Sequence, residues 1–144
     1  MKTFGFVEPL KMYRKRLAVY GVFLSDDEEK IAIVRNEKNH FFLPGGGIEG
    51  DETFKQCLKR EVVEETGFSM EMIQFIGQAQ YYFYSDNDQE YYLNIGHFYL
   101  CQFGNQICLP TENNHFLEWV SVLQAKQNLA LAHQVWALQQ ALTI

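Results

Sequence analysis

The sequence predicts an α/β (α+β) fold in which a mixed β-sheet lies between helices. Three observations lead to this prediction. Apolar stretches rich in β-branched and aromatic residues lie on both sides of one amphipathic helical stretch, glycines and short acidic runs separate them, and a second helical pattern ends the chain. With 144 residues, the chain is long enough for one domain with a real core and too short for two. We therefore expect one αβα-sandwich domain over residues 1–144.

Composition and charge narrow the classes of function. Apolar residues make up 47% of the chain, which indicates a globular protein. The net charge of −6 argues against a protein that binds nucleic-acid backbones. No apolar run approaches the length of a membrane span, and the N-terminus lacks the apolar core of a signal peptide. Together with three cysteines, expected as buried free thiols, this predicts a cytoplasmic protein without nucleic-acid or membrane partners.

Four stretches before the first glycine run predict the first strands. They are residues 1–13, 17–24, 30–36 and 41–44. The first fits a short edge strand or an arm over the core, because Pro9 disfavours a long helix there. The second is nearly all apolar and predicts a central strand, and the third returns after an acidic turn, so we expect these two to form a hairpin. The fourth ends at Pro44.

Basic residues flank these strands. Lys11, Arg14, Lys15 and Arg16 precede the central strand, and we interpret them as a solvated strand entrance rather than a phosphate contact. Arg35 ends the returning strand. It fits either a surface arginine or, as in a related architecture, a side chain that reaches a substrate phosphate.

A helix is expected directly after the glycine run. Asp51 or Thr53 can serve as its N-cap, and Thr53 with Gln56 three residues later fits a capping box. Gly67 is a natural C-terminal stop, with Phe68 placed for the hydrophobic contact that often follows. Both ends of the helix are therefore marked in the sequence.

One side of this helix carries first apolar and then acidic residues. At about 100° per residue, the apolar stripe and three carboxylates share one side of the helical wheel. The stripe consists of Phe54, Cys57, Leu58 and Val62. Glu61, Glu64 and Glu65 lie on neighbouring turns and repel each other unless a cation lies between them. Mg²⁺ and Mn²⁺ prefer such oxygen ligands; the alternative is a solvated acidic patch.

The stretch from the glycines to the helix end resembles the signature of the Nudix hydrolases, G-x5-E-x7-R-E-U-x-E-E-x-G-U, where U is a bulky apolar residue. Every fixed position is filled; the residues are Gly46, Glu52, Arg60, Glu61, Val62, Glu64, Glu65, Gly67 and Phe68. The resemblance implies a MutT-like αβα sandwich that uses Mg²⁺ or Mn²⁺. It also implies hydrolysis of a pyrophosphate bond in a nucleoside diphosphate linked to another moiety, such as a nucleoside triphosphate, oxidised or not.

The resemblance also implies roles for single residues. Metal ligands are expected at the carbonyl of Gly45 and at Glu61, Glu64 and Glu65. In some family members the residue at the position of Glu61 is the general base. Arg60 and Glu52 complete the expected catalytic set, because they can orient the carboxylates through charge-assisted hydrogen bonds.

Three strands and a helical segment are expected after the motif. The strands are predicted at 72–85, with a bend at Gly77, at 91–103 and at 116–122, and the helical segment at 121–142. The strand stretches are rich in aromatic and β-branched residues, and the apolar residues of the last segment recur with a helical spacing. The final helix should close one face of the sheet.

Two features of this second half suggest substrate contacts. Five tyrosines flank the turn between the two long strands; they are Tyr81, Tyr82, Tyr84, Tyr91 and Tyr92. Each fits cross-strand aromatic pairing or stacking on a base, and Tyr82 is the candidate for the substrate contact. In the loop before the last strand, Glu112 is the candidate for the further acid that family members use as a metal ligand or base.

The sequence leaves two alternatives open. One is a catalytically silent Nudix-fold domain that binds a nucleotide and regulates another protein, although such domains usually lose a carboxylate that is present here. The other is a pyrophosphatase specific for ADP-ribose or dinucleoside polyphosphates. Gly47 stands where MutT-type sanitising enzymes often carry a lysine, so that subgroup is not assigned. The aromatic residues near the turn leave a homodimer open as well.

Overall fold

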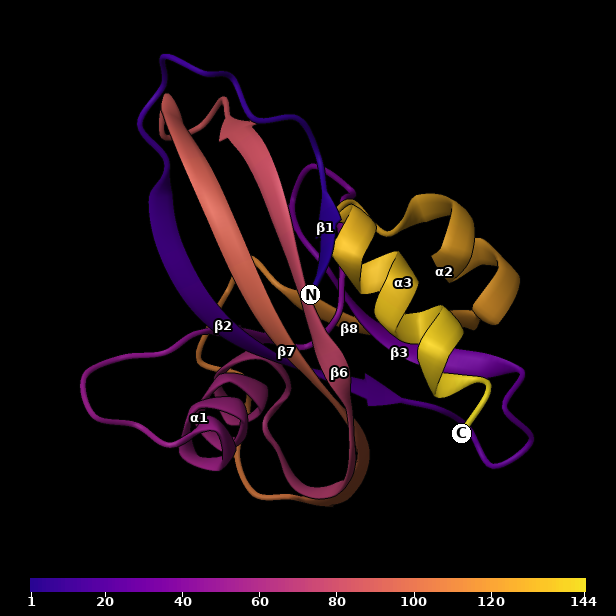
Figure 1. Cartoon of the computed structure of the whole chain (residues 1–144). Coiled ribbons are helices and arrows are strands. Elements are labelled where there is room, and N and C mark those ends of the chain that lie inside the picture. The colour runs from indigo at the N-terminus through magenta and orange to yellow at the C-terminus, as the bar shows by residue number, and fades with distance from the viewer.

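The computed structural model describes all residues, Met1–Ile144, and shows two β-sheets with helices on both sides (Figure 1). The five-stranded sheet has the order β1-β6-β7-β2-β5 and the three-stranded sheet the order β4-β3-β8. The strands are β1 (Lys2–Phe4), β2 (Arg14–Phe23), β3 (Lys30–Arg35), β4 (Phe41–Phe42), β5 (Gly45–Gly47), β6 (Phe68–Ser85), β7 (Glu90–Gln106) and β8 (Phe116–Ser121). The helices are α1 (Phe54–Thr66), α2 (Val122–Asn128) and α3 (Ala132–Ala141).

Strand β2 lies at the centre of the domain and contributes to two cores. Ala18, Tyr20 and Val22 pack in one cluster with residues of α3, whereas Val19 and Phe23 pack in a second cluster with α1. This alternation follows from the two-residue period of a strand. Strand β2 runs parallel to β7 and antiparallel to β5, so the expected αβα sandwich with a mixed sheet is confirmed.

The expected hairpin between residues 17–24 and 30–36 is wrong. Strand β3 pairs with β4 and β8 in the smaller sheet, while β2 pairs only with β5 and β7. The two strands are joined only by an isolated bridge between Leu24 and Ile31. Local composition identifies strands, but the partner of each strand depends on contacts between distant parts of the chain.

The glycine run that precedes the helix forms the edge strand β5. Its register places Gly45 opposite Tyr20 and Gly47 opposite Ala18. Gly45 has a φ of 138°, and a Cβ built there would lie 2.1 Å from the carbonyl oxygen of Val19. Only glycine therefore allows this strand to approach β2 so closely.

Helix α1 begins and ends as the sequence predicts. The Thr53 side chain accepts a hydrogen bond from the Gln56 N–H (3.1 Å), and the Gln56 side chain accepts one from the Thr53 N–H (2.9 Å). Gly67 adopts a left-handed conformation, and its N–H donates to the carbonyl of Val63. Leu58 and Val62 are fully buried. The apolar stripe therefore packs the helix against the sheet, and this also fixes the position of the carboxylates in the second half of the helix.

The C-terminal segment forms two helices rather than mainly one. Helix α2 ends at Asn128, and the Ala130 N–H then donates to the carbonyl of Phe41 (2.9 Å). This contact interrupts the helical path and places α3 against β6 and β7. As a result, the first turn of α3 lies next to Leu43. The side chain of Gln134 accepts a hydrogen bond from the backbone N–H of Leu43 (2.8 Å).

The cysteines only partly follow the expectation of buried thiols. All three are free; Cys57 and Cys101 are buried, whereas Cys108 is exposed in the loop after β7. Burial raises the pKa of the Cys57 thiol to about 11 and that of Cys101 to about 12, so both stay protonated. No helix is long and apolar enough to cross a membrane.

A buried polar chain joins α3 to the sheet. His133 is fully buried, and its Nε2 donates to Asn94 Oδ1 (2.9 Å), while Asn94 Nδ2 donates to the Tyr20 hydroxyl (3.0 Å). Burial lowers the pKa of His133 to about 4, because the imidazolium would lose its hydration.

We predict that this histidine makes stability dependent on pH. The unfolded chain takes up a proton at the ordinary pKa of 6.5, whereas the folded chain does so only near 4, so stability is lost as the pH falls between these values. From pH 7 to pH 5, wild type should lose about 2 kcal/mol more unfolding free energy than His133→Gln. Urea unfolding at both pH values measures this; an equal loss in both proteins would contradict the prediction.

Candidate active site

A cleft of about 600 Å³ opens where β5, α1, the start of α3 and the loop before β8 meet. One side is acidic and belongs to α1 and the loop before β8. The other side is formed by the sheet face that carries Tyr20 and Asn94, and by Leu131 and Gln134 of the α3 start. The cleft therefore brings together segments from most of the length of the chain.

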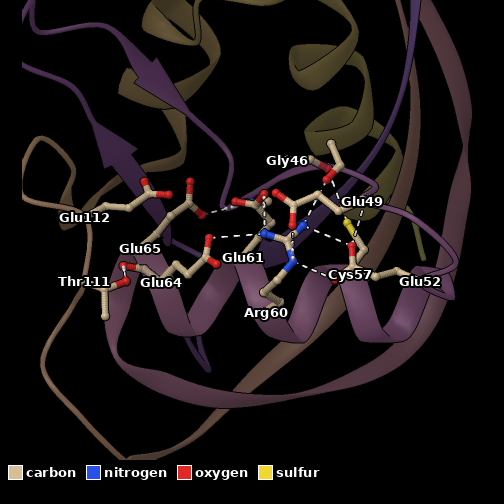
Figure 2. Close-up of polar contacts among 12 residues, drawn as sticks. Gly46, Glu49, Glu52, Cys57, Arg60, Glu61, Glu64, Glu65, Thr111 and Glu112 are labelled. Carbon is tan, nitrogen blue, oxygen red and sulfur yellow. Dashed lines mark hydrogen bonds and ion pairs between the residues drawn. The ribbon is translucent and has the colours of Figure 1, made fainter.

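Four carboxylates converge on the acidic side (Figure 2). Glu61, Glu64 and Glu65 project from α1, and Glu112 approaches them from the loop before β8. Oxygen atoms of Glu61, Glu64 and Glu112 lie within 4.8 Å of one another, and the same holds for ligand atoms of Glu65, Glu112 and His115. The structure thus places Glu112 in the site that the sequence predicted for it.

The loop that carries Glu112 is attached to the end of α1. The backbone N–H groups of Thr111 and Glu112 both donate to the carbonyl oxygen of Glu64, at 3.0 and 3.1 Å. The side chain of Glu112 also contacts Nδ1 of His115. These contacts hold the fourth carboxylate next to the three on the helix.

Two carboxylates of the helix, those of Glu61 and Glu65, are buried enough to disfavour their charge. Glu65 is only 7% exposed, and its Oε1 accepts a hydrogen bond from the Gly45 N–H (2.9 Å). Burial raises the pKa of Glu65 well above its usual value, and burial also raises that of Glu61. Neighbouring carboxylates add to both shifts, whereas Arg60 opposes the shift of Glu61, so the single arginine does not offset all the acids of the cluster.

Glycines let the backbone of β5 approach this cluster. A Cβ built on Gly46 would lie 2.6 Å from the carboxylate of Glu61. The N–H of Gly45 already contacts Glu65, so the strand edge and the acidic residues form one wall. Main-chain groups and carboxylates can therefore face the same bound group.

Arg60 connects the motif residues from the flank of the helix. Its guanidinium donates to Glu52 (2.6 and 3.1 Å), to Glu61 (3.1 Å) and to Glu64 (3.2 Å). It also donates to the carbonyl of Gly47 (3.0 Å), which ties the helix to β5. The hydrogen bond from Arg60 lowers the pKa of Glu52, and the same bond raises that of Arg60. Arg60 therefore links Glu52 to Glu61 and Glu64 through hydrogen bonds.

The donor set fits a divalent cation. It consists of carboxylate oxygens that crowd together although burial disfavours their charge. A hard ion such as Mg²⁺ prefers oxygen ligands and would remove the repulsion among them. Glu61, Glu64, Glu65 and Glu112 are the residues in position to hold it.

Two predicted substrate residues do not line the cleft. Arg35 donates to Glu118 (3.1 Å) and to Asn39 (3.0 Å) on the smaller sheet, as in the surface-arginine interpretation. Tyr82 packs edge-to-face on Tyr13 (5.0 Å between ring centroids), which precedes β2, whereas its cross-strand partner on β7 is Leu93, so the expected cross-strand aromatic pair is not formed. Both lie outside the cleft lining, so neither reaches this site in the structure.

Several lining residues were not singled out from the sequence. They are Tyr20, Lys38, Phe83, Asn94 and Gln134, together with Arg16, which was assigned to the solvated cluster. Phe83 is the neighbour of Tyr82 on β6 and faces the other side of the sheet. Side chains alternate between the two faces of a strand, so Phe83 could have been predicted to line the cleft once it was known which face of β6 borders it.

The fold and the site define a single αβα domain with an acidic cleft beside a glycine strand. The sequence matches the NUDIX domain over residues 14–139, and the chain therefore belongs to the NUDIX family. A MutT-like protein of Streptomyces ambofaciens is 39% identical over 61 residues, which is 42% of this chain and 40% of that protein. The chain thus aligns with less than half the length of this relative.

Solved structures of similar fold agree with the family. A NUDIX hydrolase from Nitrosomonas europaea superposes with a TM-score of 0.69 at 20% identity and covers 90% of each chain. The E. coli dihydroneopterin triphosphate pyrophosphohydrolase superposes with a TM-score of 0.68 at 17% identity, covering 90% of this chain and 97% of that one. At these identities the likeness establishes the fold, and the predicted family and fold are confirmed.

We predict that Arg60 stabilises the metal-free protein. Arg60→Met should lower the unfolding free energy by about 2 kcal/mol, because three carboxylates lose a hydrogen-bonded cation. Lys59→Met is the matched control, since Lys59 is the exposed neighbour on the same helix and has no ion pair. Urea unfolding in a chelator measures both variants; equal stability would show that Arg60 does not hold the cluster together.

Proposed function

We propose that the protein is a Mg²⁺- or Mn²⁺-dependent pyrophosphohydrolase that acts on a nucleoside diphosphate linked to another moiety, such as a nucleoside triphosphate. The observation that carries this proposal is the convergence of Glu61, Glu64, Glu65 and Glu112 beside the glycine strand. Membership in the NUDIX family and the fold likeness to hydrolases of that family support an enzyme of this class.

The remainder of the cleft suits a nucleoside. The side of the cleft opposite the carboxylates has an apolar and aromatic lining, formed by Phe42, Phe83 and Leu131, on which a base can stack. Gln134 is fully buried; its Oε1 accepts from Leu43, whereas its Nε2 has no hydrogen-bond partner. Gln134 therefore lies beneath the surface of the cleft and leaves one amide donor unpaired, which is costly.

Hydrolysis of a phosphoanhydride needs charge neutralisation and a positioned water. When bound, a divalent cation supplies the charge neutralisation and lowers the pKa of water. Glu61, Glu64, Glu65 and Glu112 would hold that cation, and Arg60 keeps Glu61 and Glu64 in position through the hydrogen bonds described above.

We assign the role of general base to Glu61 or Glu112, either of which would accept the proton of the attacking water. The water oxygen forms a bond to phosphorus as the bond to the bridging oxygen breaks. The products are a nucleoside monophosphate and pyrophosphate, or the phosphate of the second moiety. The carbonyl of Gly45 remains our candidate for a further metal ligand.

We predict that Glu65→Gln lowers kcat by roughly 100-fold or more, because the variant lacks a charge of the metal site. The amide can still accept the hydrogen bond from Gly45, so the fold should be retained. Glu71→Gln is the matched control, since Glu71 is exposed on β6 and distant from the cleft lining. Phosphate release with coupled pyrophosphatase and phosphatase measures turnover; an unchanged kcat would reject Glu65 as a ligand.

We also predict that turnover requires a divalent cation. The substrates to compare are nucleoside triphosphates, oxidised nucleotides, nucleotide sugars, ADP-ribose and dinucleoside polyphosphates, each with Mg²⁺ and with excess chelator. Activity that persists in chelator would contradict the role of the acidic cluster. Nucleotide binding without any turnover would instead identify a catalytically silent domain, and one preferred substrate would define the subgroup.

A further inference from the structure

Arg16 is the member of the basic cluster that enters the cleft. Arg14 pairs with Glu90 (3.4 Å), and the ammonium of Lys11 lies over the ring of Tyr91 (5.5 Å from its centroid). Lys15 and Arg16 are both exposed, but only Arg16 belongs to the cleft lining. The interpretation as a solvated strand entrance is therefore kept for its neighbours, whereas the exposed side chain of Arg16 also borders the cleft.

The guanidinium of Arg16 lies over the glycine strand. A Cβ built on Gly47 would come within 2.7 Å of Arg16 Nε, so the arginine occupies the space that a side chain at this position would take. Gly47 is also buried and its carbonyl accepts from Arg60. Arg16 is thus held across β5 from the α1 carboxylates, at the edge where the strand borders the cleft.

No protein group satisfies this guanidinium. Arg16 makes no side-chain hydrogen bond and no ion pair, although Arg14 and Arg60 both make them. Its cross-strand neighbour Asn94 cannot serve, since its oxygen accepts from His133 and its amino group donates to Tyr20. Five guanidinium donors therefore remain for a ligand.

The charges in the cleft indicate what that ligand carries. Two cations line the cleft: Lys38 donates to the neutral amide of Asn87 (2.8 Å), whereas the guanidinium of Arg16 has no hydrogen-bond partner in the protein. Its charge also opposes the rise that burial causes in the pKa of Tyr20, so it acts on the interior of the cleft. A metal ion at the carboxylates would repel Arg16 unless an anion lay between them.

We propose that Arg16 binds the phosphate chain of the substrate from the side of β5 opposite the carboxylates, and that Gly47 is required because it leaves room for this guanidinium. The proposal rests on the proposed function for the nature of the substrate. Arginine suits this task, because its planar fork matches the oxygens of a phosphate group. The substrate's phosphates then lie between the guanidinium and the metal-binding acids.

The test measures phosphate binding separately from turnover. Inorganic pyrophosphate with Mg²⁺ is titrated calorimetrically into wild type, Arg16→Ala, Gly47→Ala and Arg14→Ala. Arg16→Ala should raise the Kd for pyrophosphate about tenfold, since a charge-assisted hydrogen bond is lost. Gly47→Ala keeps the guanidinium but displaces it, so it should weaken binding in the same direction. Arg14→Ala removes the same charge from the same strand and should leave the Kd near that of wild type.

A nucleoside without phosphate provides the second titration. Its affinity should be the same in wild type and Arg16→Ala. Unchanged pyrophosphate binding in Arg16→Ala, an equal loss in Arg14→Ala, or weakened binding of the nucleoside would each overturn the proposal. Because these are binding measurements, they remain decisive for Arg16 even if wild type turns over no nucleotide, which is the outcome that would refute the proposed function.

Discussion

The hydrogen bond between the Gly45 N–H and the buried carboxylate of Glu65 is the contact on which the site depends. It joins the edge strand of the larger sheet to the acidic half of α1. An apolar stripe that includes Leu58 and Val62 supplies the burial that brings the helix into this position. The burial that stabilises the helix is therefore also what drives carboxylates into the protein, where their charge is disfavoured.

This cost is reduced by an ordered set of polar contacts. Arg60 donates hydrogen bonds to Glu52, Glu61 and Glu64. Glu65 accepts a hydrogen bond from the backbone of β5. The acids nevertheless outnumber the arginine, so the cluster is incomplete without further positive charge. Unbalanced charge of this kind is typical of functional sites, where a bound ion or ligand supplies the interactions that the folded protein lacks.

The cleft has different chemistry on the two sides of β5. Carboxylates lie on the α1 side, whereas Arg16, Tyr20 and the unpaired amide of Gln134 lie on the other. Glycines in the strand between them allow both sides to approach a bound molecule closely. A small ligand with an anionic centre and a planar polar ring would complement both sides, and this pattern is the structural basis of the proposals made above.

The sequence by itself determined the helix, its caps, the central strand, the acidic motif and the family, because these are local patterns of spacing. The capping box at Thr53 and the stop at Gly67 follow from neighbouring residues alone. Tertiary structure decided which strands pair and which side chains share the cleft. Strand β3 pairs with β8 instead of forming the expected hairpin, and Arg16 and Gln134 line the same cleft although they are far apart in the chain. Contacts of this kind depend on how whole elements pack, which no short window of sequence encodes.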